Sequence, residues 1–124
     1  MRTWIAIALA AVSIAVSALA ADKHDFDVRV ISRSLTEEKD GKIVLDNKTK
    51  TIEVRSDFGN WKAPFGDIIS AELERRGERT YLHLRQRMRE GEADHFFVLK
   101  NRDDITRDIT QFEQMTGLSV KSSK

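Results

Sequence analysis

The sequence predicts an α+β domain in which six or seven short antiparallel strands precede one amphipathic C-terminal helix. Three observations support this fold class. Apolar Phe26, Val28 and Val30 alternate with polar residues, which is the two-residue period of a half-buried strand. Runs of β-branched residues flank an Asp-Asn turn at 46–47, as in a hairpin. Apolar residues recur at helical spacing near the C-terminus, within 105–115.

Residues 1–20 have the layout of a secretory signal peptide. Arg2 supplies a positive start, an apolar stretch follows, and the small residues Ala18 and Ala20 stand at positions −3 and −1 of a cleavage site. We therefore expect cleavage after Ala20. The mature protein would be a single domain of residues 21–124, located in the bacterial periplasm or secreted.

An uncleaved leader is the alternative. Residues 4–21 would then form a single-pass inner-membrane anchor, although they are near the lower length limit for a membrane helix. They are also rich in alanine and hence weakly hydrophobic. In that case the protein would be a membrane-tethered envelope component.

The composition excludes several kinds of site. The chain has no cysteine, so disulfides, zinc–thiolate centres, iron–sulfur clusters and cysteine nucleophiles are excluded. Lysine and arginine number 21 against 20 aspartate and glutamate, and Arg2 lies in the leader, so the mature domain is neutral. Its net charge gives no reason to expect a nucleic-acid partner, and any anion binding must arise from a local cluster.

The first half of the domain should contain three strands and two loops. The first strand is expected over 26–32, and 36–41 is expected to be a polar loop. The runs 43–45 and 51–54 should form a hairpin. The segment 57–66 contains two glycines, an asparagine and a proline, so it should be irregular.

The segment 67–89 supports two interpretations. The residues from 71 to 76 have helical propensity, but apolar side chains alternate on both sides of Gly77. Composition around Tyr81 favours a strand, so we predict a second hairpin that turns at Gly77. Residues 96–99 are all apolar, which is typical of a strand buried on both faces.

The C-terminal helix is expected over 103–116, with a start signal at Asn101. The acidic residues of its first turns (Asp103, Asp104 and Asp108) are explained by the positive end of the helix dipole. Gly117 can end the helix in a left-handed turn, after which Leu118 packs back onto it. The tail 121–124 should be frayed.

This order of elements resembles the pleckstrin-homology-like (PH-like) superfold, and in particular its bacterial members. The segments that carry the resemblance are 41–54, 64–73, 96–99 and the helix at 103–116. The resemblance implies a bent antiparallel half-barrel of seven strands, plugged at one end by the helix. Members that bind phosphoinositides carry a basic loop between their first two strands, whereas residues 33–40 are mixed in sign. An inositol-phosphate site is therefore not implied.

Six arginines lie between residues 75 and 89, with Glu78 the only acidic residue among them. Alternate side chains of a strand share one face. The expected binding site is therefore one outward column: Tyr81, His83, Arg85 and Arg87. Arginines beside an aromatic ring can hold phosphate or carboxylate groups. The alternative is a solvated face on which the arginines pair with Glu72 and Glu74 of the neighbouring strand.

The three histidines are not expected to share a metal ion. His24 is close to the start of the mature domain and should be mobile. In the expected hairpin, His83 would face the region of Leu99, and His95 would face that of Arg87. The two imidazoles would lie about 13 Å apart at the usual strand rise. A shared ion needs both nitrogens within about 2 Å of it.

The sequence contains no nucleophile-elbow, zinc-protease or phosphate-loop pattern. We therefore expect an exported, non-catalytic binding or interaction module that needs no cofactor. Its partner would be a protein, an anionic lipid or lipopolysaccharide, with weak membrane contact. The alternative is a small exported hydrolase or inhibitor with its site in 57–66, where Trp61 and Phe65 bracket Pro64. Burial of those two rings is the favoured reading.

Overall fold

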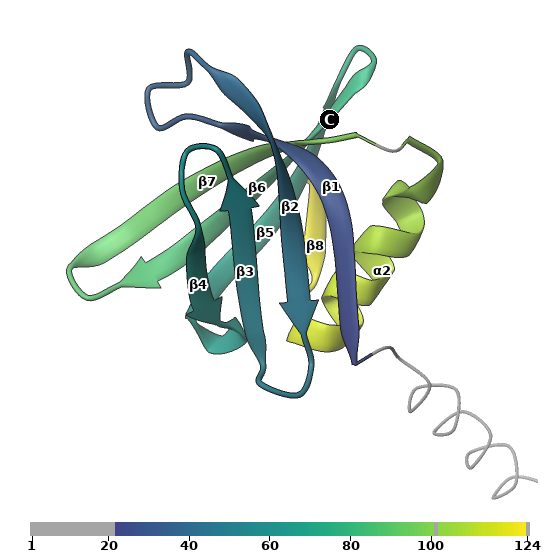
Figure 1. The fold of residues 1–124 in the computed structure, drawn as a ribbon. Coiled ribbons are helices and arrows are strands. Elements are labelled where there is room, and N and C mark those ends of the chain that lie inside the picture. Colours follow the sequence, from purple (N-terminus) through teal and green to yellow (C-terminus); the bar gives the residue numbers. More distant parts are fainter. Residues whose placement is uncertain (1–21, 101, 124) are drawn as a thin grey trace, which may run out of the picture.

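A computed structural model describes residues 22–100 and 102–123 (Figure 1). The expected signal peptide, its cleavage site and the expected helix start at Asn101 lie outside the described residues. The elements are β1 (Lys23–Ile31), β2 (Glu38–Asp46), β3 (Thr51–Ser56), β4 (Trp61–Pro64), β5 (Ile68–Arg76), β6 (Arg79–Met88), β7 (Gly91–Leu99), α2 (Ile105–Thr116) and β8 (Val120–Ser123). Short 3-10 turns occupy Phe65–Asp67 and Arg102–Asp104.

The strands form one sheet in the order β4-β3-β2-β1-β7-β6-β5-β8. Every neighbouring pair is antiparallel except β5 and β8, which are parallel. Figure 1 shows the sheet curled, with β1–β4 on one side and β5–β8 on the other, and α2 beside them. The result is an α+β fold with a mostly open sheet and one C-terminal helix.

A glycine in β2 allows the sheet to curl sharply. Gly41 pairs with Val28 of β1 and with Ser56 of β3. A Cβ atom at this position would lie 2.6 Å from Val30 Cγ2 and 2.7 Å from the Arg55 carbonyl oxygen. Such close approach of a neighbouring backbone is possible only for a residue without a side chain.

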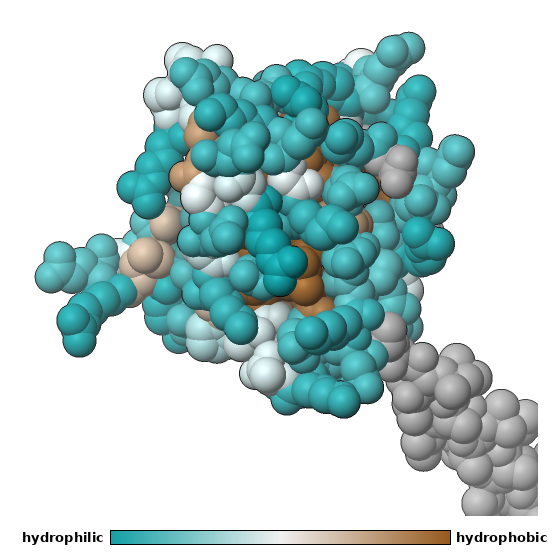
Figure 2. Space-filling model, in the orientation of Figure 1, coloured by the Kyte–Doolittle hydropathy of each residue, from teal (hydrophilic) through white to brown (hydrophobic). Residues whose placement is uncertain are grey.

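The core fills the space between the two parts of the sheet. Alternate residues are buried in β1, β2, β3 and β6, as the two-residue period predicts, whereas β7 ends in three consecutive buried residues. The largest side chains with less than 2% exposure are Phe97, Phe112, Ile43, Leu45, Ile52, Leu82, Leu84, Val28 and Val54. Seen from the side of Figure 2, the molecule is mostly hydrophilic, with hydrophobic atoms in recesses between polar side chains.

The predicted helix is confirmed and contributes two residues to this core. Phe112 is fully buried and Met115 is buried, while Ile105 and Ile109 pack against the core from its margin. Gly117 ends α2 with φ 78°, and its N–H donates to the carbonyl of the fourth residue before it. Leu118 then packs back onto the core, also as predicted.

The sheet has eight strands, so the prediction of six or seven is wrong. The segment 57–66 was expected to be irregular, yet it contains β4, in which buried Ala63 lies opposite Ile52. Pro64 ends this strand at the sheet edge, where a missing N–H donor costs nothing. The tail was expected to be frayed, but its residues 121–123 belong to β8, because Val120 packs against the core and pairs with Ala71 of β5.

Three further expectations differ from the structure or are refined by it. Residues 36–41 are not all loop, because β2 begins at Glu38 and pairs with Ile31 of β1. The hairpin predicted in 67–89 is confirmed and turns at Gly77, which has φ 60°. His24 belongs to β1 and bonds Asp108 of α2, so its expected mobility is wrong.

Candidate functional site

The predicted column of side chains lies on the outer face of β6. Leu82 and Leu84 point into the core, so alternation sends the intervening residues outward. Tyr81 and His83 are half-buried on that face, whereas Arg85 and Arg87 are exposed. The structure thus places the four expected residues on one face, but it divides them into an aromatic half and a charged half.

Arg85 is already paired with carboxylates of β7. Its Nε lies 3.3 Å from Asp94 Oδ1 and 3.6 Å from Glu92 Oε1. Sequence reasoning offered Glu72 and Glu74 of β5 as partners, but only Glu74 forms such a pair, with Arg76. Arg87 forms no ion pair with any other described residue.

The aromatic half of the column forms a floor on the outer face. His83 stacks on Phe96 of β7, with ring centroids 4.4 Å apart and an interplanar angle of 10°. Its Nε2 lies 2.9 Å from Asp94 Oδ1. The hydrogen bond from His83, followed by that from Arg85, holds the pKa of the Asp94 carboxyl below its usual value. That carboxylate therefore stays charged beside the floor.

An outer pocket of about 510 Å³ lies over this floor. Its walls come from β5, β6, β7 and the connection between β1 and β2. The lining residues are Ile31, Leu35, Thr36, Glu37, Glu38, Glu72, Glu74, Arg76, Tyr81, His83 and Phe96. Four glutamates thus face one arginine, so the pocket is acidic although it adjoins the arginine cluster.

The β1–β2 connection is an ordered wall of this pocket. The Ser32 hydroxyl accepts backbone hydrogen bonds from Thr36 at 3.3 Å and from Glu37 at 3.2 Å. The Leu35 N–H donates to the Ser32 carbonyl at 2.9 Å. Leu35 has φ 61° and is 62% exposed. A non-glycine residue in this region is strained, so the loop holds an exposed leucine in an unfavourable backbone conformation.

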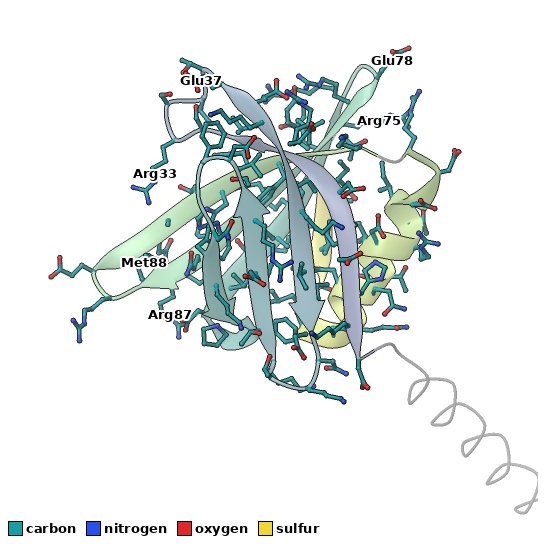
Figure 3. The ribbon with its side chains drawn as sticks, in the orientation of Figure 1. Arg33, Glu37, Arg75, Glu78, Arg87 and Met88 are labelled. Carbon is teal, nitrogen blue, oxygen red and sulfur yellow. The ribbon has the colours of Figure 1, made fainter. Side chains whose placement is uncertain are left out.

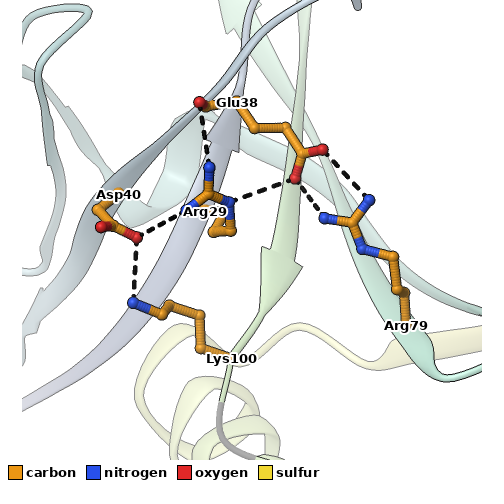
Figure 4. Close-up of polar contacts among 5 residues, drawn as sticks. All are labelled: Arg29, Glu38, Asp40, Arg79 and Lys100. Carbon is orange, nitrogen blue, oxygen red and sulfur yellow. Dashed lines mark hydrogen bonds and ion pairs between the residues drawn. The ribbon is translucent and has the colours of Figure 1, made fainter.

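Ion pairs attach this wall to the sheet (Figure 4). Glu38 at the start of β2 accepts hydrogen bonds from Arg79 of β6, and its side chain is 3.5 Å from Arg29 Nε. Arg29 also bonds Asp40 at 3.1 Å, and Asp40 accepts from Lys100 Nζ at 3.0 Å. Hydrogen bonding from Arg79 lowers the pKa of Glu38, so this link persists into mildly acidic solution.

A second cavity, of about 720 Å³, opens on the other side of Leu35. We call it the edge cavity. Its lining residues are Val30, Ile31, Ser32, Arg33, Leu35, Trp61, Met88, Arg89, Glu90, Glu92, Ala93, Asp94, His95, Phe96 and Phe97. Figure 3 labels two of them, which come from different elements: Arg33 lies on the β1–β2 connection, and Met88 lies at the end of β6.

Trp61 and His95 form an apolar wall of the edge cavity. Their rings stack with centroids 4.3 Å apart and an interplanar angle of 22°. His95 Nε2 also lies 2.8 Å from Gln86 Oε1. Burial, reinforced by the positive charge of Arg33, lowers the pKa of His95. Of the two rings expected to be buried, Phe65 is buried and Trp61 is half-buried.

The register expected for the histidines is wrong. His83 lies opposite Phe96, and His95 lies opposite Leu84, because β7 begins at Gly91 and is longer than the apolar run suggested. The two imidazoles therefore lie on opposite faces of the sheet. Within residues 22–100 and 102–123, no group of three or more His, Asp or Glu side chains could hold a metal ion.

Sequence reasoning found the floor of the outer pocket but missed its wall. The sequence of residues 33–40 indicates a polar loop of mixed charge and no binding wall. One signal was present, namely an apolar Leu35 inside a polar stretch with no apolar neighbour to form a core stripe. The second wall, formed by Glu72 and Glu74, was assigned to pairing with arginines rather than to a cavity.

No family model and no curated protein sequence matches the chain. Among solved structures, it is similar to one described as "Structure of the Spt16D Pob3N heterodimer", with 14% identity and a TM-score of 0.61 over 84% of this chain and 56% of that chain. A synaptonemal complex protein matches with 14% identity and a TM-score of 0.50, over 79% of this chain and 28% of that one. The chain thus spans 56% of the first of these structures and 28% of the second. Similarity at 14% sequence identity shows the fold alone.

The class that these features define is a curled, mostly antiparallel sheet with one C-terminal helix, and its fold resembles a PH-like half-barrel. Fold likeness of this kind assigns no activity. Within the described part of the chain, no helix is long and apolar enough to cross a membrane.

Proposed function

We propose that the protein is an exported, non-catalytic interaction module that binds a basic polypeptide segment in the outer pocket. The observation that carries the proposal is the composition of that pocket, in which four glutamates and one arginine surround an aromatic floor. Lysine and arginine side chains are attracted to carboxylates and to the faces of aromatic rings.

Two of the four glutamates are available to a ligand. Glu38 is paired with Arg29 and Arg79, and Glu74 is paired with Arg76. Glu37 and Glu72 form no ion pair with any other described residue, and both are exposed. They stand on two different walls, so a basic side chain between them would satisfy both carboxylates.

The anionic ligand expected from the arginine cluster is less well supported by the geometry. Arg85 is paired with Asp94 and Glu92, so its charge is compensated before any ligand arrives. Arg87 and Arg89 remain exposed near the β6–β7 turn. Lipopolysaccharide or lipid phosphate would have to bind these two residues rather than the predicted column.

The alternative of a hydrolase site in 57–66 has little geometric support. The nearest hydroxyl, that of Ser56, accepts a hydrogen bond from Phe58 N–H and donates one to the Gly59 carbonyl. These bonds shape the β3–β4 turn. The segment then serves as an edge strand and as one wall of the edge cavity, which is a binding role.

Peptide binding measured by fluorescence anisotropy tests this proposal. The probes are a labelled peptide of lysine and valine, a glutamate and valine counterpart, and phosphatidylglycerol vesicles. We expect the basic peptide to bind and the binding to weaken with salt, because exposed charges are screened beyond about 8–10 Å near physiological strength. Preference for the acidic peptide or for the vesicles would overturn the proposal in favour of an anion site.

Charge reversal locates the binding on the protein. Glu37→Lys/Glu72→Lys should abolish binding of the basic peptide. The matched control is Asp57→Lys/Glu78→Lys, which makes the same charge change at exposed positions outside both cavities. Equal losses in the two double variants would show that binding follows net charge rather than the pocket.

The exported location remains part of this proposal. Its support is the order of Arg2, an apolar stretch and Ala18-Leu19-Ala20 in the sequence. Intact-mass measurement on the protein recovered from an exporting bacterium should give a chain that begins at Ala21. A species that still begins at Met1 in the membrane fraction would favour the tethered alternative.

A further inference from the structure

Strand β7 has an unpaired edge where it leaves the body of the sheet. It runs from Gly91 to Leu99, but β1 pairs only with its last three residues, through Val28–Val30. Beyond that point β1 bends away toward its connection to β2. In the described part of the chain, residues 91–96 therefore have a strand partner only on their β6 side.

The edge cavity lies along this free edge. Six consecutive residues of β7, from Glu92 to Phe97, line one side of it, and residues 30–33 line the other. Figure 1 shows that the β6–β7 hairpin projects from the sheet and diverges from the β1–β2 connection. The free edge of β7 thus borders the edge cavity.

The two cavities adjoin one another beside the free edge of β7. They share three lining residues, Ile31, Leu35 and Phe96. An extended segment lying beside β7 would send alternate side chains to opposite faces of the sheet. One set would contact the Trp61–His95 wall, and the other would reach the acidic outer pocket.

We propose that the partner binds by strand addition to residues 91–96 of β7, with apolar side chains facing inward and basic side chains facing the outer pocket. This proposal rests on the proposed function and states how the basic segment is held. Backbone hydrogen bonds to β7 would supply affinity, and the two cavities would select the alternating pattern.

Charge at the edge favours a basic strand over a second copy of this chain. Glu92 and Asp94 lie on the outer face of β7, opposite Arg87 and Arg85 of β6, and both line the edge cavity. These two carboxylates share one cation, Arg85, so pairing two copies along β7 would bring excess negative charge together, and like charges opposite one another are destabilising. A basic strand would place cations beside the same residues.

The two outer edges of the sheet are poorer sites. Strands β4 and β8 have four residues each, and β4 ends at Pro64, which lacks an N–H donor. The free part of β7 has six residues and no proline. A segment of about eight residues would cover it, since strands rise roughly 3.3 Å per residue.

The test uses peptides of about eight residues, sized to the free edge, against the mature domain of residues 21–124. The first alternates valine and lysine, and the second has the same composition in two blocks. Two further versions of the alternating peptide carry backbone N-methyl groups, one on the odd-numbered residues and the other on the even-numbered residues. Each version therefore lacks N–H donors along one edge of the extended peptide. Because an added strand pairs through one edge, one methylated version should bind at least about tenfold more weakly and the other should bind normally.

Amide signals of residues 91–96 provide the second readout. Binding of the alternating peptide should shift these signals and slow their hydrogen exchange, with little change in β4 and β8. If the alternating and block peptides bind equally, or both methylated versions retain full affinity, strand addition is wrong although the outer pocket still binds basic peptide. If no basic peptide binds at all, the proposed function fails as well.

Discussion

His24 of β1 and Asp108 of α2 form a hydrogen bond across the end of the sheet. His24 Nε2 lies 2.8 Å from Asp108 Oδ1, and their side chains are only 15% and 9% exposed. The His24 ring also lies beside Phe26, with centroids 5.9 Å apart. This hydrogen bond thus connects β1 to α2, the helix that covers the core.

Removal of the imidazole should destabilise the fold. His24→Ala leaves the buried Asp108 side chain without its hydrogen-bond partner, and an unsatisfied buried polar group costs about 1–3 kcal/mol. Urea denaturation of a protein comprising residues 21–124 measures the loss. The double variant His24→Ala/Asp108→Ala should recover part of the stability, because no orphan carboxylate remains. Additive losses would show that the two side chains are not coupled.

The helix is held mainly by Phe112, which is fully buried. Phe112→Ala should lower the free energy of unfolding by about 3–5 kcal/mol, as expected for a truncated core aromatic. Phe58→Ala is the matched control, because Phe58 is 40% exposed and contacts Lys39 at the surface. Chemical denaturation of both variants provides the comparison. A loss below about 1 kcal/mol for Phe112→Ala would mean that α2 does not plug the core.

Gly41 should be sensitive to the smallest possible substitution. In Gly41→Ala the new methyl group would lie 2.7 Å from the Arg55 carbonyl oxygen, which belongs to the backbone of β3 and moves only with the strand. We expect a loss of about 1–3 kcal/mol from this overpacking. Gly66→Ala serves as the control, since no atom lies within 4 Å of its added Cβ. Similar melting temperatures for the two variants would contradict the steric account.

The fold was largely predictable because its signals are local. Alternation identified the strands around Phe26 and Leu82, and helical spacing identified α2 around Phe112. Strands β4 and β8 were missed because each has only four residues, which is too short for a clear alternation pattern. Each depends on pairing with a longer strand, β3 for β4 and β5 for β8. Pro64 and Gly66 predicted irregular structure, but β3 supplies enough pairing to make the preceding residues a strand.

The candidate site was less predictable because it depends on pairing between distant segments. Alternation placed Tyr81 and His83 on one face correctly. The partners of Arg85 could not be identified, because the register of β7 depends on where the β6–β7 turn falls. Glu37 reaches the outer pocket because it lies on the β1–β2 connection. The position of that connection depends on the ion pairs that Glu38 forms with Arg29 and Arg79.

The stability of the domain should fall in mildly acidic solution through His95. Burial lowers the pKa of this imidazole below its ordinary value of 6.5, so it stays neutral in the fold while the unfolded chain takes up a proton. The free energy of unfolding therefore decreases as pH falls below 6.5. His95→Gln should flatten this dependence relative to wild type, as measured by urea denaturation across pH 5–7.5. If the difference in free energy of unfolding between wild type and His95→Gln stayed constant over that pH range, His95 would not be a buried neutral ring.

Leu35 should show opposite effects on stability and on binding. Its φ of 61° is costly for leucine, whereas asparagine adopts this conformation readily. Leu35→Asn should therefore raise the free energy of unfolding by about 0.5–1 kcal/mol, while Leu35→Val, with a β-branched side chain, should lower it. The leucine side chain is 62% exposed and borders both cavities, so its loss removes little packing from the free domain.

The same substitution should weaken peptide binding. Leu35 lies between the outer pocket and the edge cavity, where an added strand would cover its side chain. Loss of this apolar contact should reduce affinity for the alternating valine–lysine peptide by about tenfold, because burial of a leucine side chain contributes about 1.5–3 kcal/mol. Thermal denaturation and fluorescence anisotropy on the same preparation separate the two effects. A variant that is more stable and still binds fully would show that Leu35 is strained for a reason other than recognition. A variant that is less stable would show that the Ser32 hydrogen bonds, rather than the leucine, determine the conformation of the loop.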